Sequence, residues 1–491
     1  MSAYRSTRRT LFLFLLGLSV PLEALWAADS GGADWPTVAH DVRRSNYTPR
    51  APEPPYRVRW VWASGDRQAP AAGEVYADNR LTWCFGAGPT HVTARFNQLT
   101  QPMVKDNVAY IGAVDGQVYA IDVASGRTRW KAQASGSVLH CATVGDEGVY
   151  FATVRGLDAF GFDGRKRWTF VDPLFGAYWC CPAYTKGLVL AGSLSGIFSA
   201  VEARTGRLKW QYDADAPIYQ CPAASDQAVF FGSENMVAHA LDLETGRPLW
   251  RVPVNGNTFG HYWPVVVPKE RVVIFRTSSP QGVGAFNQIV EKAPFDHRKA
   301  QEALKAAILA DRRLRTCFIL NFADGQERVV VPAGQFGFGS SIVPPPITVP
   351  EDAPVCAGMV LSYHLSKEGA FQVPGKYLAW GDRNGPIQDF GQIDFQAGFF
   401  KSLGPVGSRM HPNAGMIRHD DFIQVSMGGR YLYGYQGGVG MGCAAVDKKD
   451  VEWSFTGGTP GNLQPVIDAL VAAGPERAAG VLPARVHERL H

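Results

Sequence analysis

Apolar and polar positions alternate along the chain in a unit that recurs about every 40 residues, a period typical of repeat architectures. In its clearest copy an apolar stretch ends at Asp115-Gly116, and an alternating stretch over 117–122 follows. A second turn at Ser125-Gly126 leads into a short strand that closes on Trp130. Asp-Gly and Ser-Gly pairs tolerate positive φ and close tight hairpins. The pattern therefore predicts antiparallel strands joined by short turns.

Three further copies follow, over 148–168, 188–210 and 228–250, so the clear repeats occupy 101–250. Their closing tryptophans are nearly evenly spaced, at Trp130, Trp168, Trp210 and Trp250. With the apolar stretch before it, each copy provides four antiparallel strands. A lone four-stranded sheet cannot bury both faces, whereas sheets stacked around an axis can. The repeat therefore predicts an all-β fold, a β-propeller with four-stranded blades.

The remaining chain repeats less regularly. We expect a fifth blade over 263–331, a sixth over 345–380 and a seventh over 416–453. The segment 57–62 reads as the last strand of a blade and would close the ring. Within an insertion at 280–315, residues 297–314 lack Gly and Pro and favour a helix. We predict seven or eight blades and favour eight.

The N-terminus has the features of an export signal. Arg5, Arg8 and Arg9 precede an apolar run over 11–20, and small residues around 24–28 provide a cleavage site. General secretion, a twin-arginine route and an uncleaved anchor all remain open. The predicted domains are a signal peptide (1–27), a propeller (28–459) and a C-terminal tail (460–491). We expect a periplasmic or secreted protein without a membrane span after signal cleavage.

Composition narrows the functional classes. The chain has 53 Gly and 33 Pro, which suits a protein with many turns, and its 19% of charged residues is typical of a globular protein. The formal net charge is only +4, with no long basic stripe, which argues against nucleic-acid binding. We expect a monomer.

The repeat resembles that of pyrroloquinoline quinone (PQQ) proteins: an apolar strand, Gly-x-x-Asp-Gly, Val-Tyr-Ala, an acidic residue, Ser/Thr-Gly and a closing Trp. The same repeat occurs in non-enzymatic relatives, including the propeller of the bacterial outer-membrane assembly machinery. The resemblance implies a binding scaffold of the cell envelope, with an envelope protein, a polymer or a small molecule as ligand. The alternative that it implies is a PQQ- and calcium-dependent oxidoreductase acting on an alcohol or sugar.

Three of the eight cysteines are in register with the repeat. Cys141, Cys181 and Cys221 recur at an even interval of one repeat, each just before the first strand of its blade. Because first strands lie nearest the axis of a propeller, these residues are a candidate ring at the channel mouth. Small buried residues reused by duplication, a disulfide within the ring, and a metal or redox site are the three interpretations.

The vicinal pair Cys180-Cys181 is the candidate cofactor-binding element, because PQQ-dependent alcohol dehydrogenases hold a vicinal disulfide against their cofactor. The Asp base and the Asn and Glu calcium ligands of those enzymes have no counterpart that we can assign, so the catalytic residues stay unknown. His261, His411 and His419 match no metal-binding spacing. The recurring acidic residues are interpreted as turn or strand-end residues that cap the backbone: Asp115, Asp122, Asp158 and Asp242.

Overall fold

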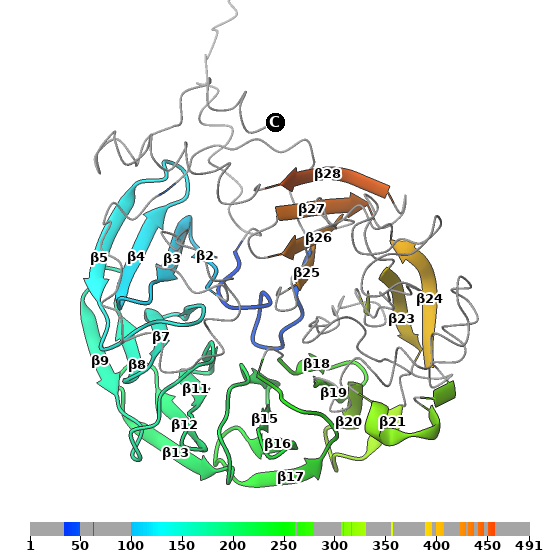
Figure 1. Ribbon diagram of the computed structural model, residues 1–491. Helices are drawn as coiled ribbons and strands as arrows, with labels where there is room; N and C mark the ends of the chain where they lie inside the picture. Colours follow the sequence, from blue (N-terminus) through cyan, green and yellow to red (C-terminus); the bar gives the residue numbers. More distant parts are fainter. Residues whose placement is uncertain are drawn as a thin grey trace, which may run out of the picture.

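The computed structural model describes residues 34–49, 62, 100–260, 263–277, 306–307, 309–315 and 317–329. It also describes the backbone of further strands within 355–456. Seven sheets are formed by these residues, and five of them are four-stranded and antiparallel. Figure 1 shows the sheets arranged in a ring, and in each sheet the successive strands lie progressively further from the centre. The predicted all-β propeller is confirmed.

The first three sheets coincide with the first three sequence repeats. Their strands are β2 (Met103–Lys105), β3 (Val108–Gly112), β4 (Gln117–Asp122) and β5 (Thr128–Gln133); β6 (Thr143–Val144), β7 (Val149–Thr153), β8 (Gly156–Phe160) and β9 (Lys166–Phe170); β10 (Ala183–Thr185), β11 (Leu188–Gly192), β12 (Ile197–Glu202) and β13 (Leu208–Asp213). Strands pair in chain order within each sheet. Each repeat therefore folds as one blade, with its first strand nearest the axis (Figure 1).

The fourth and fifth sheets follow the same plan. Their strands are β14 (Ala223–Ala224), β15 (Ala228–Ser233), β16 (Val237–Asp242) and β17 (Pro248–Pro253); β18 (Val265–Val267), β19 (Val272–Arg276), β20 (Cys317–Asn321) and β21 (Glu327–Val329). The fifth blade was predicted at this place. Between β19 and β20, residues 306–307 and 309–310 are helical and precede a short 3₁₀ helix, η2 (Arg312–Leu314). The rest of the predicted helix, 297–305, lies outside the described residues.

The last two sheets differ from the regular blade. One has three strands, β22 (Val355–Cys356), β23 (Gln388–Asp394) and β24 (Phe399–Val406). The prediction of a sixth blade over 345–380 is therefore wrong in extent, since its two long strands lie beyond 380. The other sheet holds β25 (Ile423–Gly428), β26 (Tyr431–Gln436), β27 (Gly440–Ala445) and β28 (Asp450–Thr456), close to the predicted seventh copy.

The closing tryptophans join neighbouring blades. Trp210 Nε1 donates a hydrogen bond to the carbonyl of Leu243 at 3.0 Å, in the last turn of the next blade. The same bond is made by three other tryptophans to the carbonyls of the following blade: Trp130 to Phe162, Trp168 to Ala203 and Trp250 to Phe322. The repeat thus encodes the contact between blades as well as the blade itself.

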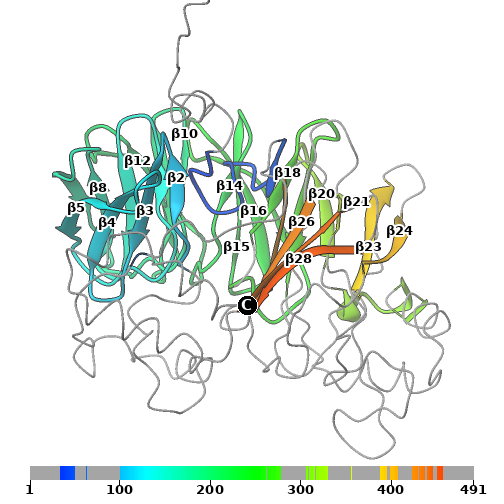
Figure 2. The same ribbon diagram turned by 90° about the horizontal axis from the view of Figure 1, so that it is seen from above.

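An N-terminal segment runs through the centre of the ring. We call residues 34–48 the axial segment; it is dark blue in Figures 1 and 2. Its strand β1 (Tyr47–Thr48) adds to the inner edge of the last sheet, parallel to β25. Its backbone also bonds inner strands of four other blades, through Trp35 with Val104, Pro36 with Val144, Val42 with Ala224 and Arg43 with Val266. The axial segment therefore spans the ring from the inside.

Several sequence predictions lie outside the described residues. They are the signal peptide, the C-terminal tail and residues 57–61 of the expected closing strand. Trp62 is described, and its Nε1 donates to Thr128 Oγ1 on the first blade at 2.9 Å. The choice between seven and eight blades stays a prediction. None of the helices among the described residues is long and apolar enough to cross a membrane.

Candidate functional site

The three in-register cysteines lie at the axis, where the inner strands begin. Each precedes its inner strand by two residues, and each is buried, with an exposed fraction of 3% or less. The backbone N–H of Cys181 donates to Cys221 Sγ at 3.1 Å. Burial and the neighbouring thiol of Cys181 raise the pKa of Cys141. The structure thus brings the residues of the candidate ring together.

His140 connects two members of this ring. Its Nδ1 accepts a hydrogen bond from the backbone N–H of Cys141 at 2.8 Å. A neutral imidazole that accepts at Nδ1 carries its proton on Nε2. Nε2 lies 3.4 Å from Cys221 Sγ and is therefore the donor of that contact. Cys221 Sγ accordingly receives two N–H groups, one from the imidazole and one from the backbone.

The axial segment covers the thiols. Thr37 Oγ1 lies 3.5 Å from Cys181 Sγ and 2.8 Å from Thr143 Oγ1. Arg44 is fully buried, and its Nη1 donates to Thr37 Oγ1 at 2.7 Å and to the Val38 carbonyl at 2.8 Å. Its Nε donates to the Pro222 carbonyl at 2.9 Å and its Nη2 to the Pro182 carbonyl at 3.4 Å. Arg44 therefore ties the axial segment to two blades at the position of the cysteines.

Cys141, Cys180 and Cys221 are poor nucleophiles and poor metal ligands. Burial is the main cause that raises the pKa of Cys180 to about 12, and it raises the pKa of Cys221 well above the ordinary value. A thiol must lose its proton to attack or to bind a metal. Cys141, Cys180, Cys181, Cys221 and Cys317 are free rather than disulfide-bonded. No group of three His, Cys, Asp or Glu side chains among the described residues is placed to hold a metal ion.

A second feature lies on the loops that join successive blades. The connections from β5 to Val138 and from β13 to Ile218 take five residues, 134–138 and 214–218. The connection from β9 to Tyr178 takes eight, 171–178, and all three of these end residues are fully buried. The longer connection exposes Pro173, Leu174 and Phe175, which we call the apolar knob. Leu174 is 65% exposed and Phe175 84% exposed.

A buried carboxylate holds the apolar knob in place. Asp172 Oδ1 accepts from the backbone N–H groups of Leu174 at 2.8 Å and Gly176 at 2.9 Å. Ser193 and Ser195 donate to the same carboxylate from the next blade, at 2.8 and 3.0 Å. Phe175 adopts φ +58°, a backbone conformation that bulky residues rarely take. The turn is therefore fixed by the fold, and its apolar side chains point outward at a cost in stability.

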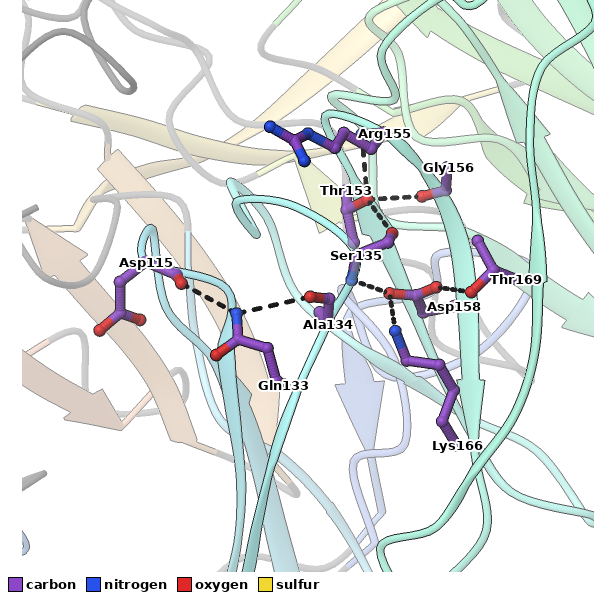
Figure 3. Close-up of polar contacts among 10 residues, drawn as sticks. All are labelled: Asp115, Gln133, Ala134, Ser135, Thr153, Arg155, Gly156, Asp158, Lys166 and Thr169. Atoms are coloured by element: carbon purple, nitrogen blue, oxygen red, sulfur yellow. Dashed lines mark hydrogen bonds and ion pairs between the residues drawn. The ribbon is translucent and has the colours of Figure 1, made fainter. Parts of the chain in front are cut away.

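A similar carboxylate supports the neighbouring loop (Figure 3). Asp158 is fully buried in the middle of β8, where it accepts from the backbone N–H of Ser135 and from Thr169 Oγ1. Lys166 Nζ lies 3.3 Å away. The interpretation of Asp158 as a turn or strand-end residue is therefore wrong, because it braces the loop between the first two blades from inside. Asp122 and Asp242 do cap turns, by accepting from the backbone N–H groups of Ser125 and Thr245.

One protein-family model matches the chain. It is described as outer membrane protein assembly factor BamB, and it matches residues 71–217 and, in an overlapping second match, 151–288. These residues contain the four tryptophan-closed repeats. Over this stretch the chain belongs to the PQQ-repeat β-propeller family.

Solved structures similar to this PQQ-repeat propeller include BamB from Moraxella catarrhalis, at 14% sequence identity and a TM-score of 0.47. That match covers 74% of this chain and 89% of the other. The computationally designed Ika8 protein is 12% identical with a TM-score of 0.42, and the match covers 72% and 85% of the two chains. No curated protein matches the sequence.

PQQ with calcium does not fit the described surroundings of Cys180 and Cys181. Cys180 Sγ points to the Gly192 carbonyl at 3.5 Å, and Cys181 Sγ to the Ala142 carbonyl at 3.4 Å. The two sulfurs are not joined as the resemblance implied. Calcium is bound by several carboxylate, amide and carbonyl oxygens, and thiols are poor substitutes. The described hydrogen-bond contacts of these two sulfur atoms are with backbone carbonyls, Thr37 and Thr143.

The three candidate histidines, His261, His411 and His419, lie outside the described residues. The apolar knob was not recognised from the sequence, although a signal was present: the tryptophans that flank it, Trp168 and Trp210, are further apart than the other successive closing tryptophans. An insertion of Pro-Leu-Phe in a polar loop position is the residue pattern behind that wider spacing.

Proposed function

We propose that this PQQ-repeat propeller is an exported, non-catalytic binding scaffold of the cell envelope. In this proposal a folded protein partner is bound through the apolar knob. The observation that carries it is the exposure of Leu174 and Phe175 on a turn held by buried Asp172. The matching family, described as an outer-membrane assembly factor, and the signal-like N-terminus support the envelope location.

The apolar knob has the properties of an interface anchor. A leucine or phenylalanine side chain gains about 2 kcal/mol when it moves from water into an apolar pocket. Because Asp172 and the two serines already fix the turn, little conformational entropy is lost on binding. Aromatic anchors on rigid turns are typical of the few residues that dominate interface energies. The apolar knob therefore suits a partner with a pocket for two apolar side chains.

The oxidoreductase alternative receives no support from these residues. The centre of the described ring is occupied by the axial segment and by buried cysteine side chains. The only charged side chain described beside the candidate ring of Cys141, Cys181 and Cys221 is Arg44, and its three guanidinium nitrogens are bonded to protein oxygens. A scaffold needs no reactive group at the axis, so this arrangement favours binding by the loops.

Photo-crosslinking in the native cell tests the proposal. A benzophenone amino acid is placed at Phe175 and, as the matched control, at Phe162, another exposed phenylalanine of the same blade. We expect one protein adduct of defined mass from position 175 and none from 162, with Leu174→Ser reducing the yield at least fivefold. An equal yield at both positions, or none at 175, would refute the docking role. An unprocessed N-terminus in the same sample would refute export.

A further inference from the structure

The fifth blade departs from the repeat at two neighbouring positions. Trp263 takes the place held by Gln101 and the three in-register cysteines in the other four-stranded blades. Arg276 takes the place of a small residue, which is Gly112, Ala152, Gly192 or Gly232 in those blades. Val265 lies opposite Ile274 in this sheet, so the register carries Trp263 to the level of Arg276. The two exceptional residues are therefore neighbours across β18 and β19.

Both residues are buried, and some of their polar atoms have no hydrogen-bond partner. Trp263 is 4% exposed and Arg276 1% exposed. Trp263 Nε1, Arg276 Nε and Arg276 Nη1 find no hydrogen-bond partner, and the same residues have no ion-pair partner among the described side chains. A buried charged donor without a partner is costly, and native proteins retain few of them. Unpaired donors on two neighbouring residues therefore indicate a missing hydrogen-bond acceptor, which a bound group would supply.

A second arginine, which is largely buried and forms an ion pair, lies close to the start of β20. Cys317 is directly opposite Arg276 on β20, and Arg315 precedes it by two residues in extended backbone. Arg315 Nη1 is 3.0 Å from Glu327 Oε2. Arg315 Nε and Glu327 Oε1 are also buried without a partner among the described residues. The register itself brings together only the three unpaired donor atoms of Trp263 and Arg276, at one end of the fifth sheet.

The alternation of side chains along β19 and β20 shows which neighbouring sheet Arg276 faces. Phe275 and Phe318 belong to the apolar cluster that the fifth blade shares with Phe230 of the fourth. Because side chains alternate along a strand, Arg276 and Cys317 lie on the opposite face. That face is on the side of the three-stranded sheet, the next around the ring in Figure 1.

Arg44 shows how this protein satisfies a structural buried arginine. Each of its three guanidinium nitrogens donates to a carbonyl or hydroxyl oxygen. Arg276 is equally buried, yet two of its nitrogens are unpaired. Arg44 therefore has its hydrogen bonds satisfied within the fold, whereas Arg276 has nitrogens that can still donate to a ligand.

The charge of the cluster selects the ligand class. Glu327 pairs with Arg315, whereas Arg276 has no ion-pair partner among the described residues, which leaves one positive charge. A charged guanidinium forms strong hydrogen bonds to a carboxylate, and an indole N–H adds a further donor. We propose that Trp263 and Arg276 form a binding site for one carboxylate group.

The carboxylate could belong to a free small acid or to the C-terminus of a peptide, and calorimetry separates the two. The probes for the full-length protein, in chloride buffer without other oxyanions, are acetate, neutral acetamide, and one tripeptide with a free or an amidated C-terminus. An acid with four non-hydrogen atoms binds no more tightly than about 0.04 mM, and we expect a dissociation constant of about 1 mM. We expect acetate to bind and acetamide not to bind. Tighter binding of the free tripeptide than of acetate would assign a peptide end.

Three variants tie the binding to the site. Arg276→Met is expected to weaken acetate binding at least tenfold, and Trp263→Phe, which removes only the indole N–H, about threefold. Arg328→Met is the control, because Arg328 lies on the same sheet but pairs with Glu270 at 3.1 Å. In buffer without acetate, Arg276→Met should melt no lower than the unchanged protein, because it removes a buried charge that has no ion-pair partner among the described residues.

Two results would overturn the site. One is the absence of acetate and tripeptide binding up to about 50 mM in the unchanged protein, far above the expected dissociation constant. The other is a lower melting temperature of Arg276→Met in ligand-free buffer together with unchanged acetate binding, since this would show that the guanidinium is paired within the fold. Neither result depends on the apolar knob, so this site can be refuted without refuting the proposed scaffold function, and the reverse also holds.

Discussion

At the scale of single residues, the contact between blades rests on a tryptophan lying on a glycine. A Cβ added to Gly246 would meet the Trp210 ring at 2.6 Å, and φ at this glycine is +73°. The equivalent glycines of three other blades meet their tryptophans in the same way: Gly164, Gly206 and Gly325. Each glycine therefore serves two needs, the positive φ of its turn and the space for the ring.

Gly246→Ala and Gly187→Ala separate these two needs. Gly187 has φ +72°, and an added Cβ would meet nothing within 4 Å. We expect Gly187→Ala to lower the free energy of unfolding by about 1 kcal/mol, the cost of left-handed backbone. Gly246→Ala should lower it by about 3 kcal/mol because it also displaces the ring. Urea unfolding measures both; equal losses would show that the tryptophan contact contributes nothing.

The residues that carry local turn chemistry could be predicted from the sequence, and those defined by burial could not. Asp122 and Asp242 act on backbone within three residues, so their pattern is visible in the chain. Asp158 lies earlier in its repeat, in the middle of β8, and its burial is decided only by the packing. Arg276 was missed for the same reason, because a lone arginine in an apolar strand carries no motif.

At the scale of elements, β16 carries a buried histidine toward the preceding blade. Burial lowers the pKa of His239 to about 3. Its Nε2 is 2.7 Å from Ser233 Oγ, and its Nδ1 is 3.2 Å from Tyr212 OH on β13. The ring stacks on Phe231 with centroids 4.9 Å apart. The neutral imidazole is therefore part of the contact between the third and fourth blades.

This contact makes stability depend on pH. The unfolded histidine titrates near pH 6.5 and the folded one near 3, so the unfolded state binds more protons between these values. The contribution is complete above pH 6.5 and is lost as the pH falls toward 3. From pH 7 to 5 it should decline by about 2 kcal/mol. His239→Gln should lose that much less than the unchanged protein over this interval in urea titrations; parallel losses would contradict the assignment.

Strands were predictable wherever the hairpin repeat is intact. The first four blades, and the fifth with its insertion, could be located because turn residues mark their ends at regular spacing. In the sixth sheet β22 ends at Cys356 and β23 begins only at Gln388, so the strands do not follow the spacing of the repeat. Strand β1 is two residues long and is defined by its partner Met427, which no local pattern indicates.

At the scale of the whole molecule, the axial segment links blades that are far apart in the chain. Its backbone bonds reach the first, second, fourth, fifth and last sheets. Four of its residues have positive φ without being glycine: Ala39, His40, Arg44 and Asn46. Such strain persists only when surrounding contacts enforce it. Burial opposes ionisation of Asp41, but the adjacent His40, the nearby Arg43 and hydrogen bonds from Ser45 hold its pKa well below the ordinary value.

Arg44 is the residue on which this arrangement depends most directly, because it bonds the carbonyls of Pro182 and Pro222 as well as the segment itself. Arg44→Met leaves buried carbonyls unpaired and should lower the free energy of unfolding by about 3 kcal/mol. If the axial segment acts as one unit, the loss spreads beyond these two blades. The amides of Val144 and Val266, which bond Pro36 and Arg43, should then exchange hydrogen about tenfold faster.

Arg44→Lys serves as the matched variant in this exchange experiment. A lysine keeps the charge but can reach only part of the four acceptors, so its effect should lie between those of methionine and arginine. Faster exchange confined to the neighbourhood of Pro182 and Pro222 would mean that each blade holds its own part of the segment. Faster exchange at Val144 and Val266 would instead make the axial segment a single clasp, whose release loosens the ring from its centre.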